Sequence, residues 1–572
     1  MADSACSSVL CCYLYRYSNF PGSGATRVTS MNDQLIRSSA KILFLGLLLF
    51  LPGSFCLAQD HGGDALQNDN CSRLTDADWT DSIDEPLDIY DAHSVDSPGE
   101  RQRYCFVRGY VWPQVQFQLV LPAAGWNGKF IEFGCGGTCG IMPQASPEGS
   151  WCHNGYACIF TDLGHEGNAF DGLWAYHNAQ AHYDFGSRAT HVTAVAGKAI
   201  TARYYGRAAN YSYFYGCSLG SEQGLIEAQR YPGDFNGIVG GGATIGETAL
   251  AMDLVWGARA LRGEDGKPLL SQEDMKMVHD AVLARCDMDD GVRDGLIGNP
   301  LACKFDPAEL ECRMPARKSG CLTHDQVEAL KKVYAGPTTS SGIKLSSGGT
   351  LPGSEHEWIT DSSRDHAVGE WIMSDGSTAE PEQFANLYFR WLARPSEGPG
   401  WNVAALDFDR DYVRFADGAK EPLIDDTNPD LRRFNASGGK LLLYVGWKEW
   451  TAPRNAIDYY NTVERVIGGP DATRRFFRLF IVPGANHCGS GEGAWAVNYQ
   501  AYMEDWVENG RAPDRLIGAH VSGNRKQTMN LRFPLKQSEV SFTRPIYPYP
   551  LWAKYSGRGD PNKAENFKPA AP

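Results

Sequence analysis

The stretch Tyr213-Phe-Tyr-Gly-Cys-Ser-Leu-Gly-Ser-Glu-Gln-Gly224 joins an aromatic, strand-like segment to a run of helix formers through a serine flanked by glycines. Its centre, from Gly216 to Gly220, has the pattern G-x-S-x-G. A sharp turn between a strand and a helix lifts the serine hydroxyl above the sheet, at a helix N-terminus that favours developing negative charge. The pattern therefore predicts that Ser218 is a nucleophile. The competing interpretation is an ordinary glycine-rich turn.

Length and charge narrow the class of protein around this motif. The chain has 572 residues, more than one domain of the usual size of roughly 100–200 residues, so we expect two or three domains. The formal net charge of −15 argues against nucleic acid or an anionic membrane as the main partner. The oligomeric state is left open.

Residues 31–58 resemble a secretory signal peptide. Basic residues precede an apolar run from Ile42 to Leu51, and Ala58 is a small residue suited to cleavage. The run is too short to cross a bilayer, which needs about 20 apolar residues. We therefore predict a secreted or periplasmic protein, with residues 1–58 outside the fold and Met31 as a candidate start.

Cysteine usage agrees with export. Of the sixteen cysteines, four lie within residues 1–58, which leaves twelve, an even number that predicts disulfides. A close pair such as Cys135 and Cys139 is also compatible with zinc, but the glycines between them favour a disulfide. Sequence spacing suggests three further pairs, Cys71 with Cys105, Cys286 with Cys303, and Cys312 with Cys321.

A second candidate for the catalytic machinery precedes the nucleophile. Residues 115–122 alternate as a strand does, and residues 129–133 form an apolar strand that runs into the cluster Gly134-Cys-Gly-Gly137. Hydrolases of this type place a second oxyanion-binding amide in such a loop, because glycines let the backbone N–H approach a tetrahedral oxygen. We expect the amide of Gly137 to take this role beside that of Leu219. A tight loop closed by a disulfide is the competing interpretation, and the two are compatible.

The alternation of strands and helices defines the fold class. Strand-like residues 155–162, an alanine-rich helical run to residue 205, and the strand, turn and helix around Ser218 predict a mostly parallel sheet with helices on both faces. The pattern breaks after about residue 250 and returns at Gly439. We therefore predict an α/β-hydrolase core in two parts, residues 59–252 and 436–572, with residues 253–435 as a large inserted lid.

The lid carries an acidic loop between Cys286 and Ile297. Four carboxylates fall within eight residues, at Asp287, Asp289, Asp290 and Asp294. Hard oxygen ligands at this spacing suit Ca²⁺, with backbone carbonyls completing the shell. A solvated acidic turn is the alternative.

The other members of a catalytic triad follow two strands in the second part of the core. The buried strand that starts at Gly439 ends before Glu449, and residues 478–482 lead to His487. Ser218, Glu449 and His487 have the chain order expected of α/β-hydrolases. Asp458 is the alternative acid.

Cysteines beside two of these residues single out the histidine. Cys217 precedes Ser218, and Cys488 follows His487. A Cys217–Cys488 bridge would hold nucleophile and base within hydrogen-bond reach, as the mechanism requires.

These paired motifs and the acidic loop resemble the tannase and feruloyl esterase family, and the resemblance extends over most of the mature chain. It includes residues 184–191, 227–232, 408–411 and 557–567. The resemblance implies a structural Ca²⁺ held by side chains and backbone carbonyls. By position, the side-chain ligands would be Asp287, Asp290 and Asp294, and the carbonyl ligands Val292 and Leu296.

The chain departs from the family pattern in two respects. Glu449 stands where the family usually has Asp, which changes the reach of the side chain. Tyr547 stands where one cysteine of a C-terminal disulfide is expected. In exchange, additional bridges near the oxyanion loop are expected among Cys135, Cys139, Cys152 and Cys158.

The resemblance also implies the reaction, which is hydrolysis of carboxylic esters of aromatic acids such as hydroxycinnamic or gallic acid. Arg390 and Arg394, in an aromatic part of the lid, are candidates to bind a carboxylate or phenol of the substrate. Two alternatives share the same residues. One is an acyltransferase that uses an alcohol in place of water, and the other is an inactive family member that acts as a binding protein.

Overall fold

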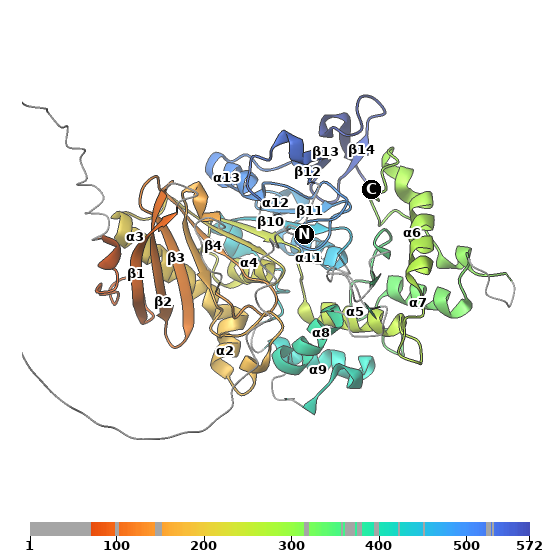
Figure 1. Ribbon diagram of the computed structural model, residues 1–572, viewed down its shortest axis with the longest axis horizontal. Coiled ribbons are helices and arrows are strands. Elements are labelled where there is room, and N and C mark those ends of the chain that lie inside the picture. Colours follow the sequence, from red (N-terminus) through yellow and green to blue (C-terminus); the bar gives the residue numbers. More distant parts are fainter. Residues whose placement is uncertain are drawn as a thin grey trace, which may run out of the picture. The chain divides into compact units, whose positions relative to one another are not determined.

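The computed structural model describes residues 70–97, 102–142, 151–313, 320–355, 358–360, 372–373, 380–393, 398, 400–420, 424–449, 452–521, 528 and 531–572 (Figure 1). The predicted signal peptide lies outside these residues. The described residues belong to one compact unit. Among the described residues, the helices are all too short or too polar to cross a membrane.

A nine-stranded sheet forms the core, and six neighbouring strands of it are parallel (Figure 1). The order is β1-β2-β3-β5-β4-β6-β7-β10-β11, with β1, β2 and β3 antiparallel at one edge. The parallel part and its crossovers confirm the predicted α/β-hydrolase core. The strands are β1 (Leu87–Ser97), β2 (Gln102–Val111), β3 (Val115–Pro122), β4 (Lys129–Phe133), β5 (Ala157–Thr161), β6 (Tyr211–Cys217), β7 (Gly237–Gly241), β10 (Lys440–Gly446) and β11 (Phe477–Val482).

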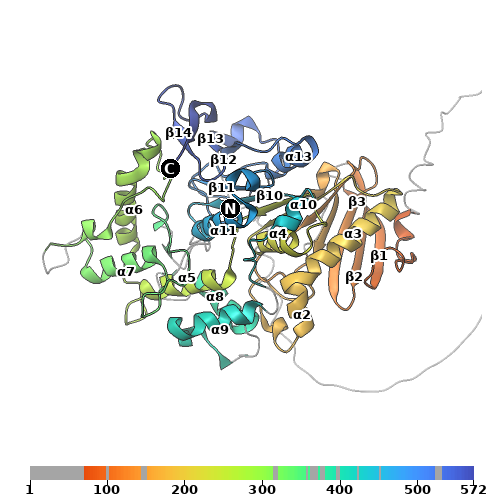
Figure 2. The same cartoon turned by 180° about the vertical axis from the view of Figure 1, so that it is seen from behind.

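Helices cover both faces of the parallel strands, which explains why these strands are apolar throughout. Phe130 and Phe214 belong to the hydrophobic cluster of one face, with residues of the α3, α4 and α11 helices. Ile131 and Tyr213, their neighbours in the chain, belong to the cluster of the other face, with residues of α13. Figure 2 shows α3 and α4 lying across the sheet. The helices of the core are α2 (Ala179–Tyr183), α3 (Ala189–Tyr205), α4 (Leu219–Arg230), α11 (Ala452–Ile467), α12 (Pro470–Thr473) and α13 (Tyr499–Asn509).

The inserted region between β7 and β10 is mostly helical. Its first helix, α5, packs against α7, α8 and α9. Two helices have capping boxes, at Ser271 before α6 and at Thr323 before α7, which satisfy free N–H groups of the first turn. The domain boundaries at residues 253 and 435 stay predictions. The elements are α5 (Glu247–Ala260), α6 (Gln272–Cys286), α7 (His324–Ala335), β8 (Ile359–Thr360), β9 (Ile372–Met373), α8 (Glu380–Leu387), α9 (Phe408–Lys420) and α10 (Arg432–Ala436).

Two hairpin-like ladders complete the C-terminal part. Tyr547, at the place of the missing cysteine, is buried and donates its hydroxyl to the Phe567 carbonyl oxygen at 3.4 Å. This bond links two C-terminal segments without a disulfide. The strands are β12 (Leu516–Val521) with β13 (Val540–Ile546), and β14 (Trp552–Tyr555) with β15 (Phe567–Ala570).

The described residues contain five disulfides, which include every pair that the sequence suggested. One expectation is wrong, because Cys152 and Cys158 are not bonded to each other. Both are buried in the hydrophobic cluster on the α13 face of the sheet. They serve there as small apolar side chains, a common environment for free cysteine. The disulfides join Cys71 to Cys105, Cys135 to Cys139, Cys217 to Cys488, Cys286 to Cys303, and Cys312 to Cys321.

Candidate active site

Ser218 lies at the turn between β6 and α4, in the strained backbone that a nucleophile elbow requires. Its φ is 62° and its ψ is −128°, a conformation that non-glycine residues rarely adopt. Gly216 permits this turn, because a Cβ atom there would lie 2.3 Å from the Gly220 carbonyl oxygen. The hydroxyl group therefore stands at the N-terminus of α4, as the sequence predicted, and the residue is partly exposed.

His487 is held next to this turn by the Cys217–Cys488 disulfide. The two bridged Cα atoms are 5.8 Å apart, although 271 residues separate them in sequence. A Cβ atom on Gly242 would lie 2.9 Å from the imidazole ring and 3.1 Å from the Cys217 sulfur. The imidazole therefore packs against the end of β7, beside the strand that carries the nucleophile.

Glu449 is the hydrogen-bond partner of His487. Its Oε2 atom lies 2.7 Å from the imidazole Nδ1, and both side chains are nearly buried. The Oε1 atom accepts the Gly446 amide at 2.5 Å, so the longer side chain folds back over its own turn. Asp458, the alternative acid, is instead near the Ser347 hydroxyl, at 3.3 Å. The structure thus brings Glu449, and not Asp458, to the histidine.

The glycine loop after β4 packs directly against the start of α4. A Cβ atom on Gly134 would lie 2.7 Å from the Gly220 Cα atom, so the two backbones touch. Gly137 has a φ of 61°, and a Cβ atom there would lie 2.5 Å from the Ala169 carbonyl oxygen. The loop therefore lies beside the amide of Leu219, the first residue of α4. The start of the loop, at Gly134, is the part in contact with α4, and the role of the Gly137 amide stays a prediction.

Buried carboxyl groups beneath the nucleophile helix were not anticipated from the sequence. Glu222, in the first turn of α4, accepts the Thr244 hydroxyl at 2.6 Å. Burial and the adjacent Glu247 raise the pKa of Glu222 well above its usual range. Burial likewise raises the pKa of Asp426, whose Oδ1 accepts the Gly246 amide at 3.1 Å. A helix pattern alone gives no sign of this group, because its members come from three distant segments.

The acidic loop of the lid has the donors that a hard cation needs. Asp287 and Asp290 are buried. Burial, together with the nearby Asp294 carboxylate, raises the pKa of Asp290 to about 7. The same two causes raise the pKa of Asp287. Carboxylates that repel one another in a buried loop fit a divalent cation, which would neutralise them. Arg544 neutralises part of this charge through a 2.5 Å contact with Asp294.

Another group, His191, Glu227 and Asp234, has one ligand atom from each residue within 4.8 Å of the others. We assign no metal to it. The His191 Nδ1 atom lies 2.5 Å from an Asp234 oxygen. The Lys198 ammonium donates to the other Asp234 oxygen at 3.1 Å and to its carbonyl at 3.0 Å. A lysine therefore already supplies positive charge there.

Of the two predicted substrate-binding arginines, the structure describes only Arg390, which lines a cavity that does not include the nucleophile. Arg390 lines a cavity of about 770 Å³ together with Phe170 and Trp391, and its guanidinium lies 4.6 Å from the centre of the Trp391 ring. Neither Ser218 nor His487 lines this cavity. Arg394 lies outside the described residues.

Comparison with known proteins shows the family to which this chain and its fold belong. The sequence model of the family "Tannase and feruloyl esterase" matches residues 102–570. An uncharacterised esterase from Xanthomonas campestris is 32% identical over 506 residues, covering 81% of this chain and 84% of the relative. Mono(2-hydroxyethyl) terephthalate hydrolase from Piscinibacter sakaiensis is 33% identical over 524 residues, covering 82% and 83%. The crystal structure of feruloyl esterase B from Aspergillus oryzae superposes with a TM-score of 0.70 at 25% identity, covering 88% of this chain and 100% of that one.

The fold and these matches define a carboxylic ester hydrolase with the α/β-hydrolase fold. The chain belongs to the tannase and feruloyl esterase family.

Proposed function

We propose that the protein is a serine esterase in which Ser218, His487 and Glu449 form the catalytic triad. The observation that carries the proposal is the 2.7 Å contact between Glu449 and His487, on a histidine joined through Cys488 to the residue before Ser218. The contact orients the ring and favours the tautomer with its free nitrogen at Nε2.

The reaction follows from these positions. The Ser218 Oγ atom attacks the ester carbonyl carbon while His487 Nε2 takes its proton, and Glu449 stabilises the imidazolium. The amides of Leu219 and Gly137 donate to the oxyanion, in a site where fixed dipoles stabilise it without reorganisation. His487 returns the proton to the leaving alcohol, which leaves an acyl-serine. Water, activated by the same histidine, then releases the carboxylic acid.

The acyl group is proposed to be an aromatic acid. Two relatives support this, one named for terephthalate and one for feruloyl esters. We retain hydroxycinnamic, gallic and related acids as the substrate class, with Arg390 and Arg394 as candidates for a distal acidic or phenolic group.

We also propose that the acidic loop holds Ca²⁺ as a structural ion. Asp287, Asp290 and Asp294 would supply carboxylates, and the carbonyls of Val292 and Leu296 would complete the shell. The ion would fix the loop that the Cys286–Cys303 disulfide closes. Export through the signal at residues 31–58 is consistent with these five disulfides.

A panel of methyl ferulate, methyl gallate and aryl acetates tests the function. We expect hydrolysis of at least one aromatic-acid ester and a loss of about 10³-fold or more in kcat for Ser218→Ala. Ser437→Ala, an exposed serine, is the matched control and should keep full activity. A folded wild-type protein without ester hydrolysis, or a Ser218→Ala variant with wild-type kcat, would contradict the proposal. Product analysis with competing alcohols separates hydrolysis from acyl transfer.

A further inference from the structure

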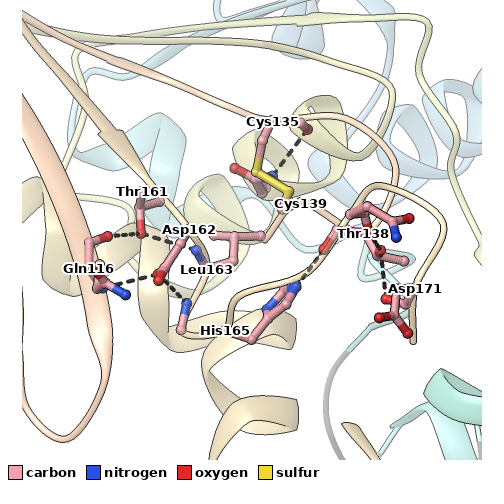
Figure 3. The surroundings of a disulfide bond; sticks show 12 residues. Gln116, Cys135, Thr138, Cys139, Thr161, Asp162, Leu163, His165 and Asp171 are labelled. Carbon is pink, nitrogen blue, oxygen red and sulfur yellow. Dashed lines mark hydrogen bonds between the residues drawn. A yellow bond between two sulfur atoms is a disulfide. The ribbon is translucent and has the colours of Figure 1, made fainter. Parts of the chain in front are cut away.

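The loop that carries the proposed oxyanion amide is closed by the Cys135–Cys139 disulfide and anchored at Thr138. Its amide donates to the Ala169 carbonyl at 2.9 Å. Its hydroxyl is 3.0 Å from two carbonyl oxygens, those of Asn168 and Asp171 (Figure 3). The Thr138 N–H belongs to the peptide that directly follows the Gly137 Cα atom, so bonds to Thr138 limit the rotation of the backbone that carries the Gly137 N–H.

A buried histidine completes this attachment. His165 is 7% exposed, and its Nε2 atom lies 2.8 Å from the Thr138 carbonyl oxygen (Figure 3). Since a carbonyl oxygen can only accept, Nε2 carries the proton and donates it. Burial lowers the pKa of His165 to about 4, although the carbonyls of Thr138 and Leu163 oppose the shift. The ring is therefore neutral above that pH, with its proton fixed by the loop.

The imidazole is itself clamped. The Trp174 ring stacks on it, with centroids 3.7 Å apart and an interplanar angle of 17°. The Trp174 indole N–H donates to the Asp171 carbonyl at 2.7 Å, and the same carbonyl accepts the Thr138 hydroxyl. Stacking and hydrogen bonding thus join His165, Trp174 and Thr138 into one closed network.

The surrounding backbone is shaped for this ring. A Cβ atom on Gly140 would lie 2.9 Å from the His165 ring, so only glycine leaves room for it. Upstream, the Asp162 carboxylate accepts the amides of Gly164 at 2.7 Å and Gln116 at 3.0 Å (Figure 3). These bonds fix the stem of the loop from which His165 projects.

We propose that His165 is a positioning residue for ester hydrolysis. By fixing the Thr138 carbonyl it holds the backbone that follows Gly137, so that the Gly137 N–H faces the oxyanion. The inference rests on the proposed function of Ser218 and on an oxyanion amide in this loop. His165 is not itself a proton carrier in the reaction, because its donor is already used by a backbone carbonyl. A misdirected donor would weaken transition-state binding and leave substrate binding largely unchanged.

Three substitutions at position 165 test the role of the hydrogen bond. His165→Leu removes the donor, His165→Asn supplies an amide too short to reach Thr138, and His165→Gln places an amide near the Nε2 position. We expect kcat to fall about 10–100-fold for Leu and Asn, with KM changed less than about threefold, and to recover most of its value for Gln. The affinity for an aryl boronic acid, which mimics the tetrahedral intermediate, should fall in parallel with kcat.

His182 provides a matched control. It is also buried, and its Nε2 atom donates to a backbone carbonyl outside the glycine loop, that of Leu392 at 2.6 Å. His182→Leu should lower thermal stability while kcat stays within about threefold of wild type.

The outcomes separate the two proposals. A wild-type enzyme whose activity depends on Ser218, combined with folded His165→Asn that keeps both kcat and boronate affinity, would overturn the positioning role alone. Equal losses for Asn and Gln would also overturn it, because they would reduce His165 to a packing role. A wild-type protein with no Ser218-dependent activity would instead overturn the proposed function.

Discussion

Glu449 departs from the usual family pattern, and its contacts explain how a longer acid is accommodated. One carboxylate oxygen faces His487 and the other accepts the Gly446 amide three residues earlier. Gly446 itself cannot carry a side chain, because a Cβ atom there would lie 2.1 Å from the Ala485 carbonyl oxygen. This close approach of the ends of β10 and β11 is what brings the acid beside the histidine.

We expect Glu449→Gln to lower kcat about 10³–10⁴-fold. An amide at this place either fails to stabilise the imidazolium or selects the wrong tautomer. Glu449→Asp, which keeps the charge but shortens the reach, should lose less, on the order of 10–100-fold. Steady-state kinetics on one aryl ester measures both. Asp458→Asn is the control for the alternative acid, and a larger loss for it than for Glu449→Gln would contradict the assignment.

His165 also predicts a pH dependence of stability. Its pKa is about 4 when folded and near 6.5 when unfolded, so the unfolded chain binds the proton first as pH falls. The stabilisation is complete above pH 6.5 and is lost between pH 6.5 and 4, by about 3 kcal/mol. Burial raises the pKa of Asp162 to about 7, so this residue makes the protein more stable as pH falls. Its contribution cancels when wild type is compared with a variant at His165, because both proteins contain Asp162.

Denaturant unfolding of wild type and His165→Gln at several pH values isolates the histidine. The free energy of unfolding of wild type relative to the variant should fall as pH is lowered from 6.5 to 4. A difference independent of pH would show that the ring titrates normally in the folded protein.

At the scale of elements, the Cys217–Cys488 disulfide joins the turn after β6 to the loop after β11. Closing a loop of 271 residues restricts the unfolded chain strongly, so replacing both cysteines by alanine should lower the free energy of unfolding by about 5 kcal/mol. We also expect kcat to fall, because the histidine loop loses its tie to the nucleophile turn.

The Cys71–Cys105 disulfide is the matched comparison, with a separation of 34 residues and a place on β2, which three strands separate from β6. Its removal should lower stability by about 4 kcal/mol while kcat stays within about twofold. Equal effects of the two double variants on kcat would argue against a positioning role for Cys217–Cys488.

The acidic loop predicts sensitivity to chelation. Removal of Ca²⁺ should lower Tm by several degrees, and added Ca²⁺ should restore it, because an ion that binds only the folded loop stabilises it. The double variant Asp287→Asn, Asp290→Asn should be insensitive to the chelator. Asp280→Asn, at an exposed ion pair on α6, should remain sensitive. Unchanged melting of wild type in chelator would exclude a structural ion.

For the whole molecule, the sequence predicts the structure correctly where a short pattern of residues has a local physical cause. Buried strands such as β10, and the glycines around Ser218, follow directly from apolar runs and from backbone strain. The Cys217–Cys488 disulfide could be predicted because each cysteine adjoins a catalytic candidate. The need to hold the nucleophile near the histidine is therefore visible in the sequence as a cysteine beside each of them.

Contacts between distant segments left no such mark. His165 bonds to Thr138, and Glu222 to Thr244, across segments with no shared periodicity. The sequence also misassigned Cys152 and Cys158, since cysteine count cannot distinguish a bridge from two apolar thiols in a core. Partner choice in such cases depends on tertiary packing.

The finding that Cys152 and Cys158 are not bonded to each other predicts the number of free thiols in the protein. A chain of residues 59–572, denatured without reductant, should titrate two thiols, Cys152 and Cys158. The native protein should react slowly, because both sulfurs are buried and burial raises the pKa of Cys158. A count of zero would show that the sixth bridge forms.

The most direct test of the account is peptide mapping after treatment with a fluorophosphonate, which reacts with activated serines. The triad predicts one stoichiometric adduct, on the peptide that contains Ser218, absent from Ser218→Ala and formed much more slowly in Glu449→Gln and in a His487→Ala variant. No adduct at Ser218 in folded protein, or an adduct whose rate is independent of His487, would contradict the central claim.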